Sequence, residues 1–148
     1  MPSTVTLYNN ALKEMALGTL KFDGSTPFKL LLVGTGSTYT VSKSHITRTN
    51  FTANSGSETS GTGYDAGGKT VAFTSSNVTI DGSNAINIAI PTIEWSSSTI
   101  SAKGALLYTN TGNPTTDKLV AYCDFGSTVS SSGSTLSVTF STPLKLQN

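Results

Sequence analysis

Charged side chains are scarce in this sequence. They make up 11% of its 148 residues, against about 25% in an average soluble domain. The nine lysines and arginines are scattered, so there is no basic stripe of the kind that general nucleic-acid binding requires. The net charge is +1 at pH 7, and a protein so close to neutrality associates easily because little repulsion keeps its copies apart. The composition favours a protein that assembles and argues against a nucleic-acid partner.

Cysteine and long apolar runs are also nearly missing. The single cysteine, Cys123, leaves no intrachain disulfide, and its strand-like surroundings predict a small buried side chain. No apolar stretch approaches the roughly 20 residues that span a membrane. The N-terminus has no cationic region followed by an apolar run, so no targeting signal is predicted. We expect a protein that is made in the cytoplasm and has no membrane partner.

The sequence offers no plausible catalytic centre. Its only histidine, His45, stands among hydroxyl and cationic side chains, with no carboxylate close in sequence, although triads and most acid–base sites use a histidine. The glycine-rich stretches at 34–36 and 61–63 lack the lysine and the following helix of a phosphate loop. No cluster has the ligand spacing of a zinc or calcium site. We therefore expect no enzymatic activity, no cofactor and no metal.

Serine and threonine are abundant instead, at 47 of the 148 residues. Between the hydroxyl-rich segments lie about eight short apolar or β-branched runs, at intervals of roughly 10–15 residues. The run 28–33 is almost continuously apolar, which predicts a central strand buried on both faces. Ile86, Ile88 and Ile90 alternate with polar residues and are expected to point inward. The predicted fold class is all-β: a single-domain β-sandwich or jelly-roll-like fold.

One amphipathic helix is predicted near the N-terminus. Five apolar positions follow the i, i+3, i+4, i+7, i+8 stripe of a helix: Tyr8, Ala11, Leu12, Met15 and Ala16. Gly18 is well placed to end it. A helix of about three turns is marginal alone and must dock its stripe on something. We therefore divide the chain into an N-terminal helical docking segment, 1–18, and a β-sandwich domain, 19–148.

The segment 38–68 is poorly periodic and is predicted to be a long loop. It contains His45 and the only arginine, Arg48. Loops of such length in a compact domain are usually functional or pack against a partner. Six residues of the helix and this loop are therefore candidate interface positions: Tyr8, Leu12, Met15, His45, Arg48 and Tyr64.

Five short stretches, in their order and spacing, resemble a group of small virion structural proteins of tailed bacteriophages. They are YNNAL at 8–12 leading into GTL at 18–20, FKLLL at 28–32, GYDAGG at 63–68, EWS at 94–96 leading to ALLY at 105–108, and LVAYCDFG at 119–126. The proteins concerned are capsid decoration (cement) proteins and head or tail fibre components. The resemblance covers most of the chain and implies an all-β domain that self-assembles, often as a trimer. It implies binding to a capsid or tail lattice and no catalytic residues.

Two functions follow as expectations. The first is a capsid decoration protein, located in the virion, that binds the major capsid protein or another virion protein and stabilises the lattice by self-association. The second is a fibre or adhesin module that binds a host receptor or glycan. In that case exposed Tyr39, Tyr64, Tyr108 or Trp95 would line a shallow groove, because aromatic rings stack on apolar sugar faces. A tryptophan such as Trp95 is more often a core residue.

Overall fold

The computed structural model describes residues 4–82 and 85–147 and consists mostly of β-structure, with 43% of residues in strands and 12% in helices. The strands are β1 (Thr4–Leu7), β2 (Phe28–Val33), β3 (Lys69–Val71), β4 (Val78–Ile80), β5 (Ala85–Ile88), β6 (Ile93–Ser98), β7 (Ser101–Thr109), β8 (Leu119–Ser130), β9 (Ser134–Val138) and β10 (Leu144–Gln147). The helices are α1 (Asn9–Ala16), α2 (Arg48–Ala53) and a short 3-10 turn, η1 (Ser75–Asn77). The prediction of a mostly β fold is confirmed, with more strands than expected and a second helix.

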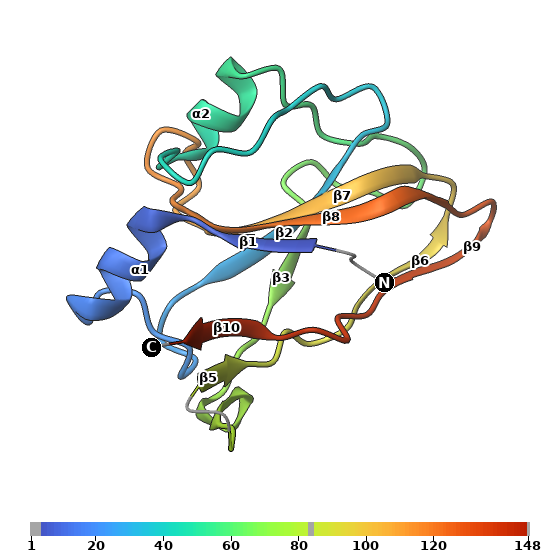
Figure 1. Cartoon of the computed structure of the whole chain (residues 1–148). Coiled ribbons are helices and arrows are strands. Elements are labelled where there is room, and N and C mark those ends of the chain that lie inside the picture. The colour runs from blue at the N-terminus through green and yellow to red at the C-terminus, as the bar shows by residue number, and fades with distance from the viewer. Residues whose placement is uncertain (1–3, 83–84, 148) are drawn as a thin grey trace.

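A five-stranded antiparallel sheet forms the middle layer of the molecule (Figure 1). Its strand order is β1-β8-β7-β2-β3. In β2, Leu30 and Leu32 belong to one core cluster, whereas Leu31 and Val33 belong to the other. The prediction of a central strand buried on both faces is confirmed, and its lack of alternation follows because both of its faces are covered.

Two small sheets, β6-β9 and β10-β5-β4, form the lower layer in Figure 1. Their apolar side chains meet those of the five-stranded sheet in the larger core cluster, which includes Trp95 and Leu144. The rings of Phe22, Phe28 and Phe73 also pack there, with centroids 4.9 Å apart in each pair. Burying a large apolar side chain stabilises a fold by about 1.5–3 kcal/mol, so this cluster is what joins the three sheets.

The part of the segment 38–68 that contains Tyr39 and Phe51 covers the opposite face of the five-stranded sheet, above it in Figure 1, whereas Tyr64 packs against the larger core cluster. The segment is not the structureless loop that the sequence predicts, because α2 lies within it and Thr47 forms a β-bridge with Lys118. The rings of Tyr39 and Phe51 pack against each other in the second core cluster, with centroids 4.8 Å apart. The segment is therefore a packed cover layer that protects the sheet from water.

The N-terminal segment belongs to the five-stranded sheet. β1 pairs with β8 along its whole length, and Tyr8, which precedes α1, is fully buried. The predicted helix is confirmed as α1, and Gly18, with φ +74°, follows its end in the left-handed conformation that glycine adopts without strain. The predicted division at residue 18 does not mark a boundary in the packing. Residues 1–3 of the predicted docking segment lie outside the described residues.

Candidate functional site

The structure does not bring the six predicted interface residues together. Tyr8 is 0% exposed, and its hydroxyl lies 2.9 Å from the hydroxyl of Tyr39. Burial is the main cause that raises the pKa of Tyr8 above its ordinary value. The prediction of Tyr8 as an interface residue is therefore wrong. The pairing of β1 with β8 places its ring inside the second core cluster, where no partner reaches it.

His45 and Met15 have neighbours within the fold. Nδ1 of His45 lies 2.7 Å from the Tyr39 hydroxyl, so the Tyr8–Tyr39 pair extends into a chain of three polar groups. Met15 is half-buried and packs against the larger core cluster. Both side chains are partly covered by their own chain.

Arg48 and Tyr64 hold the cover layer on the sheet. Nη1 of Arg48 lies 2.9 Å from Oδ2 of Asp117, which is itself fully buried. The Tyr64 hydroxyl donates to Oε1 of Glu58 at 2.6 Å and accepts from the main-chain N–H of Leu32 at 3.0 Å. Burial raises the pKa of Tyr64 above its ordinary value, with the nearby Glu58 adding to the effect. Four of the six predicted residues thus make the internal contacts that fix the N-terminal strand and the cover layer.

The aromatic side chains of the predicted glycan groove are covered. Trp95 is 1% exposed, Tyr108 is 0% exposed and Tyr39 is 8% exposed, while Tyr64 stacks on Trp95 with ring centroids 6.0 Å apart. A sugar-binding platform needs an exposed ring face. These residues therefore do not form the shallow groove that the adhesin hypothesis requires, and the prediction of Trp95 as a core residue is confirmed.

The single cysteine is enclosed. Cys123 lies in β8 with 0% exposure, which confirms its predicted burial, and this burial raises the pKa of its thiol to about 12. Such a thiol is almost entirely protonated at neutral pH and is a poor nucleophile. Within residues 4–82 and 85–147, no group of three or more His, Cys, Asp and Glu side chains is arranged to hold a metal ion.

The helices of the described chain are short. None of them is long and apolar enough to cross a membrane.

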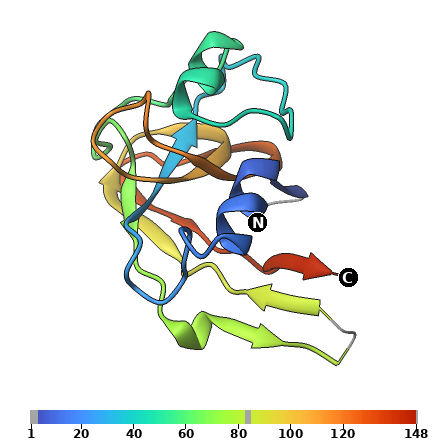
Figure 2. The ribbon, with the colours of Figure 1, turned by 90° about the vertical axis from the view of Figure 1, so that its left-hand side faces the viewer.

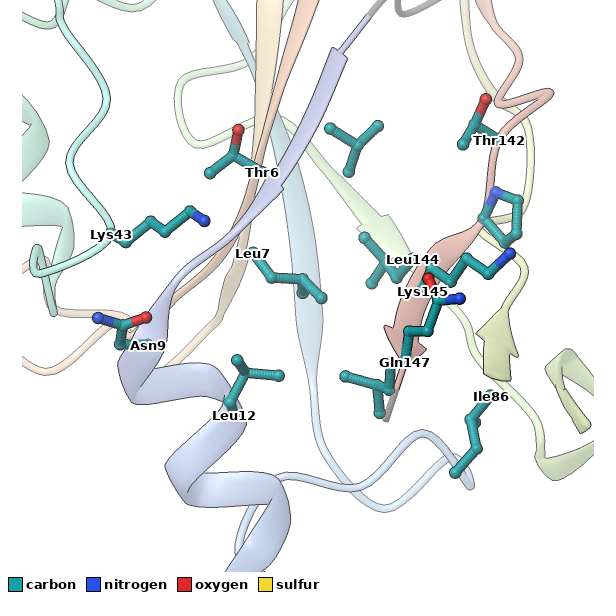
Figure 3. A pocket seen from close by; sticks show the side chains of 13 residues that line it. Thr6, Leu7, Asn9, Leu12, Lys43, Ile86, Thr142, Leu144, Lys145 and Gln147 are labelled. Atoms are coloured by element: carbon teal, nitrogen blue, oxygen red, sulfur yellow. The ribbon is translucent and has the colours of Figure 1, made fainter. Parts of the chain in front are cut away.

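A groove of about 750 Å³ lies between β1 and the start of α1 on one side and β10 on the other (Figure 3). Most of its lining is apolar: Val5, Leu7, Leu12, Ile86, Pro143, Leu144 and Leu146. Of the six predicted interface residues, only Leu12 lines it, and this side chain is 40% exposed. The groove is therefore built from segments near both ends of the described chain.

The three-stranded sheet beside the groove is apolar on one face and polar on the other. Two apolar rows cross it in register: Leu144, Ile88 and Val78 form the inner row, and Leu146, Ile86 and Ile80 form the outer row. The residues between these rows face the opposite side because side chains alternate along a strand: Lys145, Asn87 and Thr79.

The outer row is open at Ile86 and Ile80, which are 39% and 84% exposed, whereas Leu146 is half-buried against the larger core cluster. In the inner row Leu144 and Ile88 are 1% and 2% exposed, and only Val78, on β4, is open, at 38%. Figure 2 shows the reason: β10, β5 and β4 follow one another below α1, so the sheet extends away from the rest of the molecule. The expected inward position of Ile86 is therefore corrected, because the strand runs beyond the reach of the core. Apolar surface that continues a core into solvent is typical of an interaction site.

The charge at the groove is positive. Lys43 and Lys145 are the charged residues among those that line it, and Lys145 also pairs with Asp81 at 3.5 Å. The helix α1 begins at Asn9, another lining residue, so its N-terminal end adds partial positive charge. The arrangement suits an apolar partner that carries negative charge.

Comparisons with known proteins found no relative: no protein-family model, curated protein or solved structure matches this chain. The groove and the outer row are thus interpreted from their own residues. Sequence reasoning missed them because each depends on strand pairs that are distant along the chain. A signal was present in the alternation of Leu144 and Leu146, which the sequence shares with other amphipathic strands.

Proposed function

We propose that this protein is a structural component of a bacteriophage particle, and specifically a capsid decoration protein. It binds the major capsid protein or another virion protein, self-associates on the lattice, and is located in the virion. The observation that carries the proposal is the uncovered apolar surface made by the groove and the outer row. Side chains such as Ile80 are exposed to water at a free-energy cost that a bound partner removes. The resemblance of five sequence stretches to virion proteins supplies the class of partner.

The architecture is consistent with this proposal. We infer an open β-sandwich of the jelly-roll-like kind, in which the five-stranded sheet packs on the two smaller sheets around Trp95. A sandwich holds its free edges at fixed positions, which suits a protein that acts through a surface. The net charge of +1 allows many copies to lie close together on a lattice, and a trimer is the expected form of association.

The copy number in the particle tests the proposal. Purified particles of the phage that encodes the protein should contain it in numbers comparable with the major capsid protein, because a decoration protein repeats with the lattice. Quantitative mass spectrometry against the major capsid protein provides the measurement. A much smaller number would indicate a fibre, vertex or tail component. Absence from the particle would overturn the proposal.

A single substitution tests the apolar surface. Ile80→Lys should weaken binding to particles that lack the protein by about tenfold or more, because the contact would have to bury an ammonium group. The matched control is Thr79→Lys, which adds the same charge to the opposite face of β4 and should bind like the natural protein. Ile80 is 84% exposed, so both variants should keep the thermal unfolding midpoint of the parent. Equal binding by the two variants would exclude this face from the interface.

A further inference from the structure

β1 has one edge without a strand partner in the described part of the chain, because it is the outermost strand of its sheet. The N–H of Tyr8 donates to the carbonyl of Val120 at 3.1 Å, and the pairing with β8 continues in the same register toward Thr4. Main-chain groups alternate between the two sides of an antiparallel strand. The N–H and C=O groups of Val5 and Leu7 therefore point away from β8, at the groove.

β10 is likewise the outermost strand of the three-stranded sheet. The N–H of Asp81 donates to the carbonyl of Ala85 at 2.9 Å, so the main chain of Ala85 faces β4 and that of Ile86 faces β10. The register of β5 with β10 then leaves the N–H and C=O groups of Lys145 and Gln147 pointing away from β5. Two strand edges that can accept main-chain hydrogen bonds thus border one groove.

We propose that the groove accepts an extended segment of a different protein, which adds to the free edge of β1 as a further strand and places a carboxylate opposite Lys43. This inference rests on the proposed function and specifies how the virion partner is held.

The side chains of the groove suit such a strand. Val5 and Leu7 pack partly against the larger core cluster and also line the groove, as do Leu144 and Leu146. Figure 3 shows Leu7 and Leu144 on opposite sides of it. A strand added to β1 would place alternate side chains against this apolar lining and the others toward solvent. Main-chain hydrogen bonds then give affinity, and the apolar lining selects the side chains, as in other strand-addition sites.

Charge decides which occupant fits. Figure 3 shows Lys43 and Asn9 on the same side of the groove, where the N–H of Asn9 donates to the carbonyl of Lys43 at 2.9 Å. Lys145 has Asp81 as its counter-ion, whereas no ion pair involves Lys43 among the described residues. A second copy that paired its own β1 edge here would bring two Lys43 side chains and two helix N-termini together, which like-charge repulsion disfavours. An acidic segment of another chain would instead bring negative charge next to Lys43 and the helix N-terminus, where it is attracted.

A synthetic strand provides the test. The probe is a fluorescent peptide of about seven residues, alternating valine and threonine around one central glutamate, titrated with the full-length protein by fluorescence anisotropy. We expect saturable binding that weakens about tenfold when the glutamate becomes lysine, and at least as much when alternate peptide nitrogens are methylated and lose their N–H donors. Lys43→Glu should reverse the preference between the glutamate and lysine peptides.

The possible outcomes separate the parts of the proposal. Equal affinity for the methylated and the unmethylated peptide would overturn strand addition. Equal affinity for the glutamate peptide and the lysine peptide would overturn the role of Lys43. No saturable binding at about 1 mM peptide would overturn the site altogether. Self-association that the peptide competes away would show that a second copy is the occupant and would also overturn the proposal. If Ile80→Lys loses particle binding and the natural protein binds no peptide, the proposed virion function still holds. Only the strand-addition proposal is then overturned.

Discussion

Gly68→Ala is expected to remove about 4 kcal/mol or more of the free energy of unfolding, a large share of the roughly 5–15 kcal/mol that a folded domain has. Gly68 has φ +80°, and a Cβ there would overlap the main-chain carbonyl of Leu30. Leu30 is fully buried in β2, so its backbone cannot shift without disturbing the centre of the sheet. The N–H of Gly68 also donates to the main-chain carbonyl of Asp65 at 3.0 Å, which fixes the turn that leads into β3.

A second glycine, Gly112, provides a control that separates the effect of the steric overlap at Gly68 from the effect of its positive φ. Gly112 has φ +86° with nothing within 4 Å of the Cβ position. Gly112→Ala should therefore cost only the strain of the left-handed conformation, about 1–2 kcal/mol. Urea unfolding followed by circular dichroism measures both variants. If the two variants lost the same stability, the close approach of Gly68 to β2 would not be what requires glycine there.

Arg48→Met is expected to destabilise the fold by about 3–5 kcal/mol, because it leaves a buried carboxylate without its counter-ion. Asp117 is 0% exposed and accepts from Nη1 of Arg48 at 2.9 Å and from the main-chain N–H of Thr111 at 2.6 Å. The guanidinium also lies 4.6 Å from the ring centroid of Tyr108, a favourable cation–π contact. The pair thus attaches the start of α2 to the turn between β7 and β8.

The matched substitution is made at Asp117, the other residue of the ion pair. Asp117→Asn removes the buried charge and keeps an oxygen that can accept from Thr111. The double variant, Arg48→Met with Asp117→Asn, should lose less stability than the sum of the single variants, since neither charge remains to be buried alone. Urea unfolding of the four proteins gives the coupling free energy. Simple additivity would mean that the ion pair does not contribute to holding the cover layer.

The sequence predicts the elements whose signal is local. β2 and the buried Cys123 and Trp95 follow from short apolar runs, and α1 follows from its stripe. α2 was not predicted because its six residues bury only Phe51 and so show no stripe. Strict alternation along 119–125 would place Leu119 on the same face as Ala121, but a register shift in the pairing of β7 with β8 places it in the other cluster.

The candidate site is less predictable, because it depends on contacts between distant segments. Tyr8 fits the helical stripe by spacing, yet its backbone is extended at φ −82° and ψ 145°, so its ring leaves that stripe and enters the second core cluster. Of the six predicted interface residues, Leu12 is the one that lines the groove, with 40% of its surface exposed, and its role in an interface stays a prediction. The strands β1 and β10 each pair with a segment far along the chain, and periodicity carries no information about strand order.

The position of β1 and β10 has a practical consequence for anyone who produces the protein. Both strands border the groove, so an affinity tag or fluorescent fusion joined ahead of one or behind the other sits at the mouth of the binding surface and competes with its partner. The turn 111–116 is exposed, and in Figure 2 it lies on the opposite side of the molecule from the C-terminal end. An epitope or cargo peptide inserted there leaves the groove open, which makes this turn the natural point for displaying foreign sequence.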